Sequence, residues 1–198
     1  MLTAAVHRLV ERHAALRGDE VALVGESGTL TYRELNQRSN ALARHLIDTG
    51  LRRGSHVIVR MDPSPELGIV LLAVLKAGAA YSWLDIVDDC DWPEGATILS
   101  TADDGGTTRR VIDLQQALDA AGHTHANLPI LTKGTDIACV LPGRDGMPPV
   151  MVPHATITAL RSQPLPHQAR WSMEQAALDL WLPLMAGTTV TLTSLLAA

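Results

Sequence analysis

The chain has 198 residues, of which 46% are apolar and 19% are charged, and its formal net charge is −5. This size and mixture fit one globular domain with a substantial core and argue against a disordered chain. The acidic balance and the absence of a basic cluster argue against a nucleic-acid partner.

Targeting and redox signals point to the same class of protein. Charged side chains within Arg8–Arg12 interrupt the segment where a signal peptide would need an unbroken apolar stretch. The longest apolar run, Ile69–Leu75, is far shorter than the roughly 20 residues of a membrane span. Cys90 and Cys139 fit no metal-ligand spacing, which favours buried, reduced thiols. We therefore expect a soluble, cytoplasmic protein without a membrane partner.

Helical and strand patterns alternate in the N-terminal part. Thr31 and Glu34 stand at capping-box spacing and Ser64-Pro65 is a typical helix start. The predicted elements are, in order, helix Thr3–Leu16, strands Val21–Val24 and Thr29–Tyr32, a helix to about Thr49, strand His56–Met61, a helix from Ser64 towards Gly78, and strand Ala79–Leu84. The succession strand, helix, strand, helix, strand predicts a parallel sheet with crossover helices.

The second half has shorter elements and more turns. The predicted elements are strands Thr97–Leu99 and Arg110–Ile112, helix Leu114–Ala121, a loop over Gly122–Gly134, strand Ile137–Leu141, helices His154–Leu160 and Met173–Met185, and strand Thr189–Thr193. The whole pattern predicts an α/β fold with mostly parallel sheets and flanking helices.

The stretch VLPGRDGMPPVMVPH, Val140–His154, has the outline of a phosphate-binding loop. An apolar run leads into Gly143 and Gly146, and a proline pair leads into a second apolar run. Glycines allow a backbone to approach a phosphate closely, and hydroxyl and lysine side chains then hold it. This stretch contains no serine, threonine or lysine.

Four segments carry a resemblance to a known family. They are LTYRELNQRSNALARHL (Leu30–Leu46), SPELGIVLLAVLKAGAAYSWLD (Ser64–Asp85), DIACV with VMVPH (Asp136–His154), and MEQAALDLWLPLMAGTTVTL (Met173–Leu192). In order and spacing they resemble core motifs of the adenylate-forming enzymes, above all the adenylation domains of nonribosomal peptide synthetases. The second motif usually ends LKAGAAYVPLDP in that family, and the third contains YTSGSTGxPKG. The resemblance implies the N-terminal part of an adenylation fold.

The resemblance also implies which residues form the phosphate loop and where it has degenerated. Gly143 and Gly146 match the family's glycines, Pro148 matches its proline, and Pro142, Arg144, Asp145 and Pro149 replace its hydroxyl and lysine positions. Asp145 would place a negative charge beside phosphate, and prolines remove backbone donors. Among the residues at these replaced positions, Arg144 is the one whose side chain could bind an anion.

Other candidate residues have ordinary structural explanations. The resemblance aligns Glu174 with the aspartate that meets the substrate's α-amino group, so Glu174 is the candidate substrate-binding residue, although the helix around Trp181 is adequately explained by core packing. His154 is interpreted as a helix-start residue or as a residue that supports the site from behind, in preference to an acid or base in catalysis. His123 and His125 lack a third ligand, so no metal site is predicted.

The resemblance finally suggests a truncated protein. A full adenylation domain continues well past this length, so we expect a single truncated adenylation-like domain, residues 1–198, without the C-terminal subdomain. The family uses ATP and magnesium, but the degenerate loop predicts no cofactor and no catalytic residue here. The expected role is a non-catalytic scaffold, docking or regulatory partner of a peptide synthetase assembly line, or a self-associating protein. The alternatives are half of a split amino-acid-activating ligase completed by another chain, or a decayed remnant.

Overall fold

The computed structural model describes residues 4–84, 96–100, 111–121, 124, 126–129, 132–141, 148–161 and 173–192. Its elements are α1 (Val6–Leu16), β1 (Val21–Gly25), β2 (Gly28–Thr31), α2 (Tyr32–Asp48), β3 (His56–Arg60), α3 (Pro65–Lys76), β4 (Ala80–Leu84), β5 (Thr97–Ser100), β6 (Val111–Asp113), α4 (Leu114–Ala121), β7 (Ile137–Leu141), β8 (Val150–Pro153), α5 (His154–Leu160), α6 (Met173–Ala186) and β9 (Val190–Thr191). Most predicted elements are confirmed to within a few residues. β8 was not predicted as a strand.

The two predicted helix starts are confirmed in atomic detail. At the start of α2, the Thr31 hydroxyl accepts from the Glu34 backbone N–H, and the Glu34 carboxylate accepts from the Thr31 backbone N–H. At the start of α3, the Ser64 hydroxyl accepts from the Leu67 backbone N–H, and Pro65 occupies the first turn. Both caps satisfy backbone donors that an α-helix leaves free.

The strands form two sheets, with orders β2-β1-β9 and β6-β5-β3-β4-β7-β8. The larger sheet is parallel from β6 to β7, and only the hairpin β7–β8 is antiparallel. The predicted α/β class is confirmed, with one correction. The run β2-α2-β3-α3-β4 does not build one sheet, because β2 pairs with β1 in the smaller sheet. The β1–β2 hairpin is tight, and its strand pairing takes β2 out of the crossover series.

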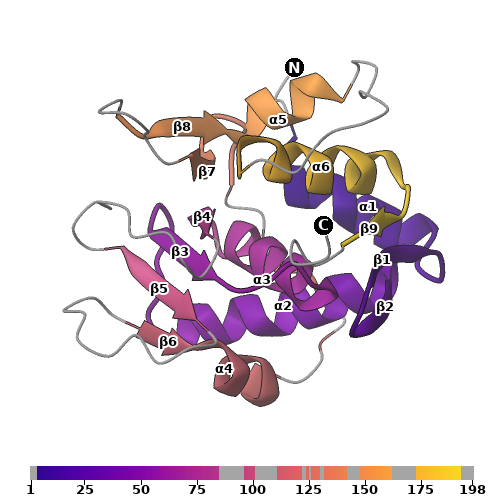
Figure 1. Cartoon of the computed structure of the whole chain (residues 1–198), viewed down its shortest axis with the longest axis horizontal. Coiled ribbons are helices and arrows are strands. Elements are labelled where there is room, and N and C mark those ends of the chain that lie inside the picture. The colour runs from indigo at the N-terminus through magenta and orange to yellow at the C-terminus, as the bar shows by residue number, and fades with distance from the viewer. Residues whose placement is uncertain are drawn as a thin grey trace.

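Helix α3 lies between the two sheets and forms the centre of the core (Figure 1). Every residue of α3 except Glu66 is buried, so the helix has no solvent-facing side. Gly68 permits this packing, because a Cβ at that position would collide with the Leu23 side chain of β1. Gly78 ends the segment with a φ of 79°, a conformation that favours glycine.

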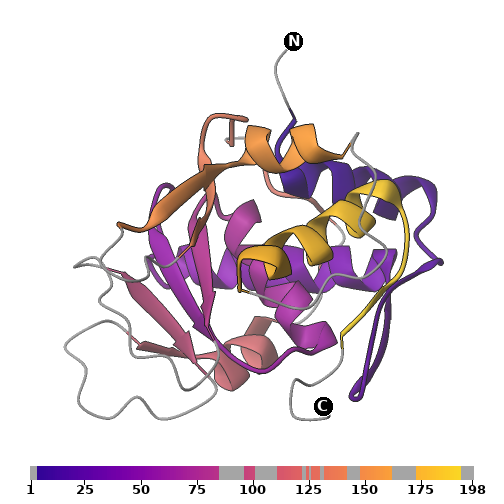
Figure 2. The same cartoon turned by 45° about the horizontal axis from the view of Figure 1, so that its top comes forward.

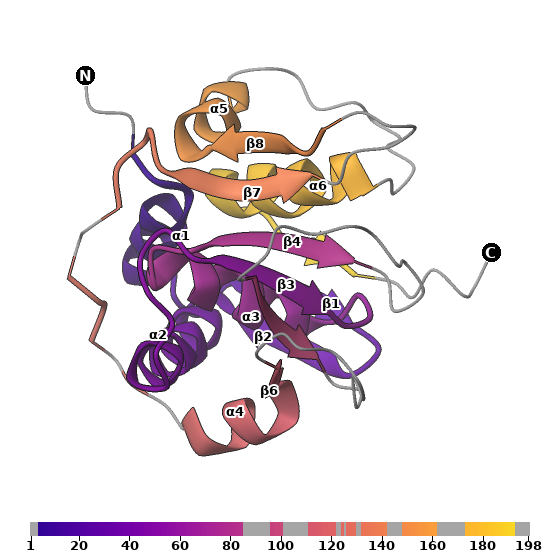
Figure 3. The same ribbon diagram turned by 90° about the vertical axis from the view of Figure 1, so that its left-hand side faces the viewer.

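The hairpin β7–β8 with α5 and α6 forms one side of the molecule (Figure 3). In that view β3, β4 and β7 point the same way, and β8 returns in the opposite direction. Helix α6 packs against β7 and α5 and runs towards β9, which Figure 2 shows from another direction. In the described part of the chain, no helix is long and apolar enough to cross a membrane.

Candidate functional site

The candidate site is the turn that joins β7 to β8. The register pairs Leu141 with Val150, so residues 142–149, PGRDGMPP, close the hairpin. This turn follows the carboxyl end of β7, and in sheets with parallel strands that end is where ligands bind. Helix α6, which carries the fourth motif, packs against β7. The fold therefore brings the third and fourth motifs to neighbouring elements.

The structure places only some of the predicted site residues. Gly143, Arg144 and Gly146 lie outside the described residues, so their phosphate-loop role stays a prediction. Pro148 is exposed two residues before β8 begins. Glu174 belongs to the first turn of α6, but its side chain lies outside the description. Cys90, His123 and His125 also lie outside it.

The junction between β4 and β7 depends on side chains. β3 and β4 are in register over five residue pairs, whereas β4 and β7 share one, Tyr81 with Cys139. One residue further along, the Ser82 hydroxyl donates to the Val140 backbone carbonyl at 2.6 Å. The Ser82 side chain thus donates a hydrogen bond to a backbone carbonyl near the end of β7, shortly before the candidate turn.

His56 completes this arrangement from β3. Its Nε2 lies 2.8 Å from the Ser82 hydroxyl oxygen. Because the single hydroxyl proton of Ser82 is donated to Val140, Nε2 must carry a proton and donate to Ser82. Ser82 is therefore not paired with a general base, and this serine–histidine pair does not have the arrangement of an activated nucleophile.

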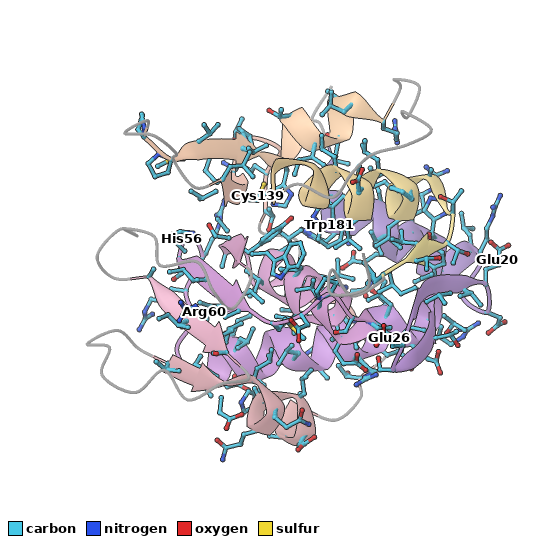
Figure 4. All side chains as sticks on the ribbon, in the orientation of Figure 1. Glu20, Glu26, His56, Arg60, Cys139 and Trp181 are labelled. Carbon is cyan, nitrogen blue, oxygen red and sulfur yellow. The ribbon has the colours of Figure 1, made fainter. Side chains whose placement is uncertain are left out.

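A second buried link joins α6 to the same junction. Trp181 Nε1–H donates to the Tyr81 hydroxyl oxygen at 2.6 Å, and Tyr81 is the residue of β4 that pairs with Cys139 of β7. Cys139 on β7 and Trp181 on α6 are labelled in Figure 4. Burial raises the pKa of the Cys139 thiol to about 12, so the thiolate is suppressed at neutral pH. The prediction of a buried Cys139 is confirmed, and its environment disfavours thiol chemistry.

His154 begins α5, as predicted, and is buried. Its Nδ1 accepts a hydrogen bond from the Val6 backbone N–H of α1 at 3.2 Å, and the His7 ring meets it edge-on at 5.8 Å between centroids. Burial lowers the pKa of His154 to about 4 and the pKa of His7 to about 3. Both imidazoles are thus neutral near pH 7, and His154 acts as an acceptor that anchors α1.

A buried polar cluster joins α1, α2 and α3, and sequence analysis missed it. The Lys76 ammonium, whose side chain is fully buried, donates to Glu11 at 2.9 Å and to Asn36 and Asn40 at 2.7 Å each. Both asparagine amides donate in turn to Asn127. Burial lowers the pKa of Lys76 to about 8, while the Glu11 carboxylate opposes that shift. One signal was available, because Lys76 ends an otherwise apolar helix in a chain with only two lysines.

Other places in the described part of the chain offer no better site. No group of three or more metal-ligating side chains occurs among the described residues. A hollow of about 310 Å³ lies beside Arg53 and Asp136, at the amino ends of β4 and β7. Arg53 and Asp136 are paired with each other there at 2.7 Å. This hollow is at the edge of the sheet opposite the candidate turn.

Comparison with known proteins identifies the family. Residues 10–102 match the family model described as "AMP-binding enzyme". The chain is 32% identical to malpibaldin synthetase of Mortierella alpina over 92% of its own length. The chain belongs to the AMP-binding family.

Solved structures show the same fold. An artificially fused adenylation–PCP di-domain of a nonribosomal peptide synthetase from Klebsiella oxytoca superposes with a TM-score of 0.84 at 23% identity, over 98% of this chain and 40% of that one. The N-terminal subdomain of Klebsiella oxytoca NpsA gives a TM-score of 0.81 at 23% identity, over 98% of this chain and 56% of that one. This AMP-binding chain therefore has the fold of the N-terminal subdomain of such adenylation domains. It spans 4% of the length of malpibaldin synthetase.

The family model matches a part of the chain that ends before the candidate turn, whereas the similarity to malpibaldin synthetase, over 92% of the chain, extends across the turn. The matched segment ends at residue 102, well before β7 begins at Ile137. It contains the capped helices α2 and α3 and the Lys76 cluster. The hairpin turn of this AMP-binding chain has one arginine, one aspartate and three prolines, which do not fit the binding of a triphosphate. No catalytic step can be derived through ATP at this turn.

Proposed function

We propose that this chain is an adenylation-type subdomain of nonribosomal peptide biosynthesis that does not itself form aminoacyl adenylates, and that acts as a scaffold or docking partner of the assembly line. The observation that carries this proposal is the composition of the turn. The register of β7 and β8 assigns residues 142–149 to the connection, and these residues include no hydroxyl and no lysine side chain.

The physical argument concerns uncompensated charge. A triphosphate that leaves water must recover its hydrogen bonds from donors in the protein. Three of the eight turn residues are prolines and donate no backbone N–H, and the charge of Arg144 is offset by Asp145. Stabilising the departing phosphates is normally the main electrostatic task in such a reaction. A turn of this composition lacks the groups for that task.

Exposed apolar side chains support a docking role. β8 is an edge strand of the larger sheet, and on it Val150 and Met151 are 56% and 66% exposed. Edge strands with exposed apolar residues are places where another chain can pair or pack. The proline pair before β8 and Pro153 at its end limit the free edge to a short segment. We infer that a component of the peptide synthetase packs against this segment.

Catalysis is tested by ATP–pyrophosphate exchange with the full-length protein and each proteinogenic amino acid. We expect exchange no faster than in a blank without enzyme. Exchange above the blank with any amino acid would favour the second candidate, a ligase whose remaining parts come from elsewhere. That candidate has support from the fold, which is close to the NpsA subdomain over 98% of this chain.

Docking is tested by affinity capture from the producing cell followed by mass spectrometry. The variant carries Val150→Thr and Met151→Gln, and the matched control carries Leu16→Gln, because Leu16 is 69% exposed on α1. We expect a peptide synthetase component to be captured by the wild type and the control but not by the double variant. Equal capture by all three proteins would remove β8 as the docking surface, and capture of a second copy alone would indicate self-association.

A further inference from the structure

The attachment of the β7–β8 hairpin to the rest of the sheet is unusual in depending on side chains. The single registered pair between β4 and β7 contrasts with the five pairs between β3 and β4. A parallel ladder normally supplies evenly spaced backbone hydrogen bonds along the strands. Where such a ladder is short, side-chain bonds must contribute more of the attachment.

Two residues at this junction differ from the usual form of the second family motif. That form ends AAYVPLDP, whereas this chain has AAYSWLD, so Ser82 and Trp83 replace a valine and a proline. Both replacements make hydrogen bonds that valine and proline cannot make. The Ser82 hydroxyl donates to the Val140 carbonyl at 2.6 Å, and Trp83 Nε1–H donates to the Met61 carbonyl at 2.8 Å.

These bonds tie β4 to both neighbouring strands near their carboxyl ends. Ser82 connects β4 with β7, and Trp83 connects β4 with the residue that follows β3. His56 pairs with Ala80 across the β3–β4 ladder and reaches Ser82 diagonally, two residues further along β4. Because Ser82 is 1% exposed, water cannot readily replace its hydroxyl as a donor.

We propose that His56, Ser82 and the Val140 carbonyl form a latch that fixes the β7–β8 hairpin against β4. In this latch, His56 Nε2–H donates to the Ser82 hydroxyl oxygen, and the Ser82 hydroxyl donates to the Val140 carbonyl. On the other side of β4, the hydrogen bond from Trp83 Nε1–H to the Met61 carbonyl ties β4 to the residue that follows β3. Ser82 is a positioning residue, since it acts on β7 through the Val140 carbonyl. This inference goes beyond the proposed function, because the latch holds the hairpin whether or not a nucleotide or a partner binds.

The test uses two substitutions of equal size at one position. Ser82→Thr keeps the hydroxyl, and Ser82→Val removes it while matching the family's usual residue, so both variants are expected to fold. Native-state hydrogen exchange of the full-length protein, followed by NMR, reports the opening of individual amides. We expect the amides of β7 and β8 to exchange about tenfold faster in Ser82→Val, in line with the loss of one buried hydrogen bond, and at the wild-type rate in Ser82→Thr. Amides of β3 between Val57 and Val59 serve as the internal reference.

Equal exchange rates in the valine and threonine variants would overturn the latch. The latch would also be overturned if the β3 reference amides exchanged faster by the same factor as the β7 and β8 amides, since the effect of the substitution would then be global. If neither variant folds, the same measurement is made on His56→Gln and His56→Leu, because glutamine keeps a side-chain N–H donor for Ser82 and leucine does not. Faster exchange of β7 and β8 in His56→Leu alone supports the latch, and equal behaviour of that pair contradicts it. ATP titration of the same variants reports separately on the proposed function.

Discussion

The helices around Lys76 and the hairpin β7–β8 are attached to the core in opposite ways. Lys76 uses its three donors on three partners from α1 and α2, inside a helix packing that is buried almost completely. The hairpin has one registered pair with β4 and presents an exposed edge strand. The region that the family model matches is therefore held together by a buried polar cluster, whereas the hairpin is attached to β4 by one registered pair and a side-chain hydrogen bond.

The largest expected effect is the loss of the Lys76 charge. Lys76→Met keeps the apolar stem but removes one of the two cations that pair with the buried Glu11 carboxylate, which retains Arg8, and it leaves the side-chain oxygens of Asn36 and Asn40 without their donor. Breaking a buried ion pair in this way costs about 3–5 kcal/mol, so we expect a drop of that size in the free energy of unfolding. Chemical denaturation measures it.

A double variant serves as the control for the Lys76 prediction. Lys76→Met with Glu11→Leu removes both charges, so it should recover a large part of the loss. Arg8, which bonds Glu11 from a half-exposed position, would then be released to solvent. If Lys76→Met alone costs less than about 1 kcal/mol, the cluster is not the fixed region that the comparison requires.

The next effect concerns pH and the link between α1 and α5. The folded pKa values of His7 and His154, about 3 and about 4, lie below the ordinary value of 6.5. Between pH 6.5 and about 4 the unfolded chain therefore binds protons that the folded chain does not, and the free energy of unfolding rises with pH. We expect stability to be lost as pH falls through this window, at up to about 1.4 kcal/mol per pH unit for each histidine.

Denaturation at a series of pH values checks this prediction, with His7→Phe as the comparison. The charges of His154, Lys76 and Arg8 act on His7, and Asp136 acts on His154, so the difference between the two proteins reports the loss of His7 together with its electrostatic effect on His154. The variant should show a shallower dependence between pH 6.5 and 4. An identical dependence in both proteins would mean that His7 does not titrate with folding.

Much of the fold followed from local sequence signals, and the misses have physical reasons. The capping box at Thr31 and the Ser64-Pro65 start are local, and they fixed α2 and α3 almost to the residue. The assignment of β2 to the smaller sheet was missed because pairing with β1 and β9 is a tertiary event. β8 was missed because it is short, it ends in Pro153, and its apolar residues do not alternate with polar ones.

The candidate site was predicted less completely than the fold. Sequence motifs located the turn and α6, and the structure placed them on neighbouring elements. The Ser82 and Lys76 bonds were not predictable, since each joins residues from elements far apart along the chain. His154 was predicted as a helix start, but its role as an acceptor for α1 depends on a residue 148 positions away.

The smallest of the stability effects concerns the link between α6 and β4. Tyr81→Phe removes the oxygen that accepts from Trp181 Nε1–H and leaves a buried donor without a partner. We expect a loss of about 1–3 kcal/mol in the free energy of unfolding. A double-mutant cycle with Trp181→Phe should recover part of it. If the two losses simply add, the bond does not couple α6 to the β4–β7 junction.

Calorimetric titration of the full-length protein with ATP and magnesium tests the central claim most directly. The account predicts no saturable binding below about 1 mM, because the turn lacks the donors for a triphosphate. The matched gain variant carries Asp145→Ser and Pro149→Lys, which return a hydroxyl and a lysine to the turn, and it should bind ATP more tightly than the wild type. Micromolar affinity for ATP in the wild-type protein would contradict the claim that this turn has lost the ability to bind a nucleotide.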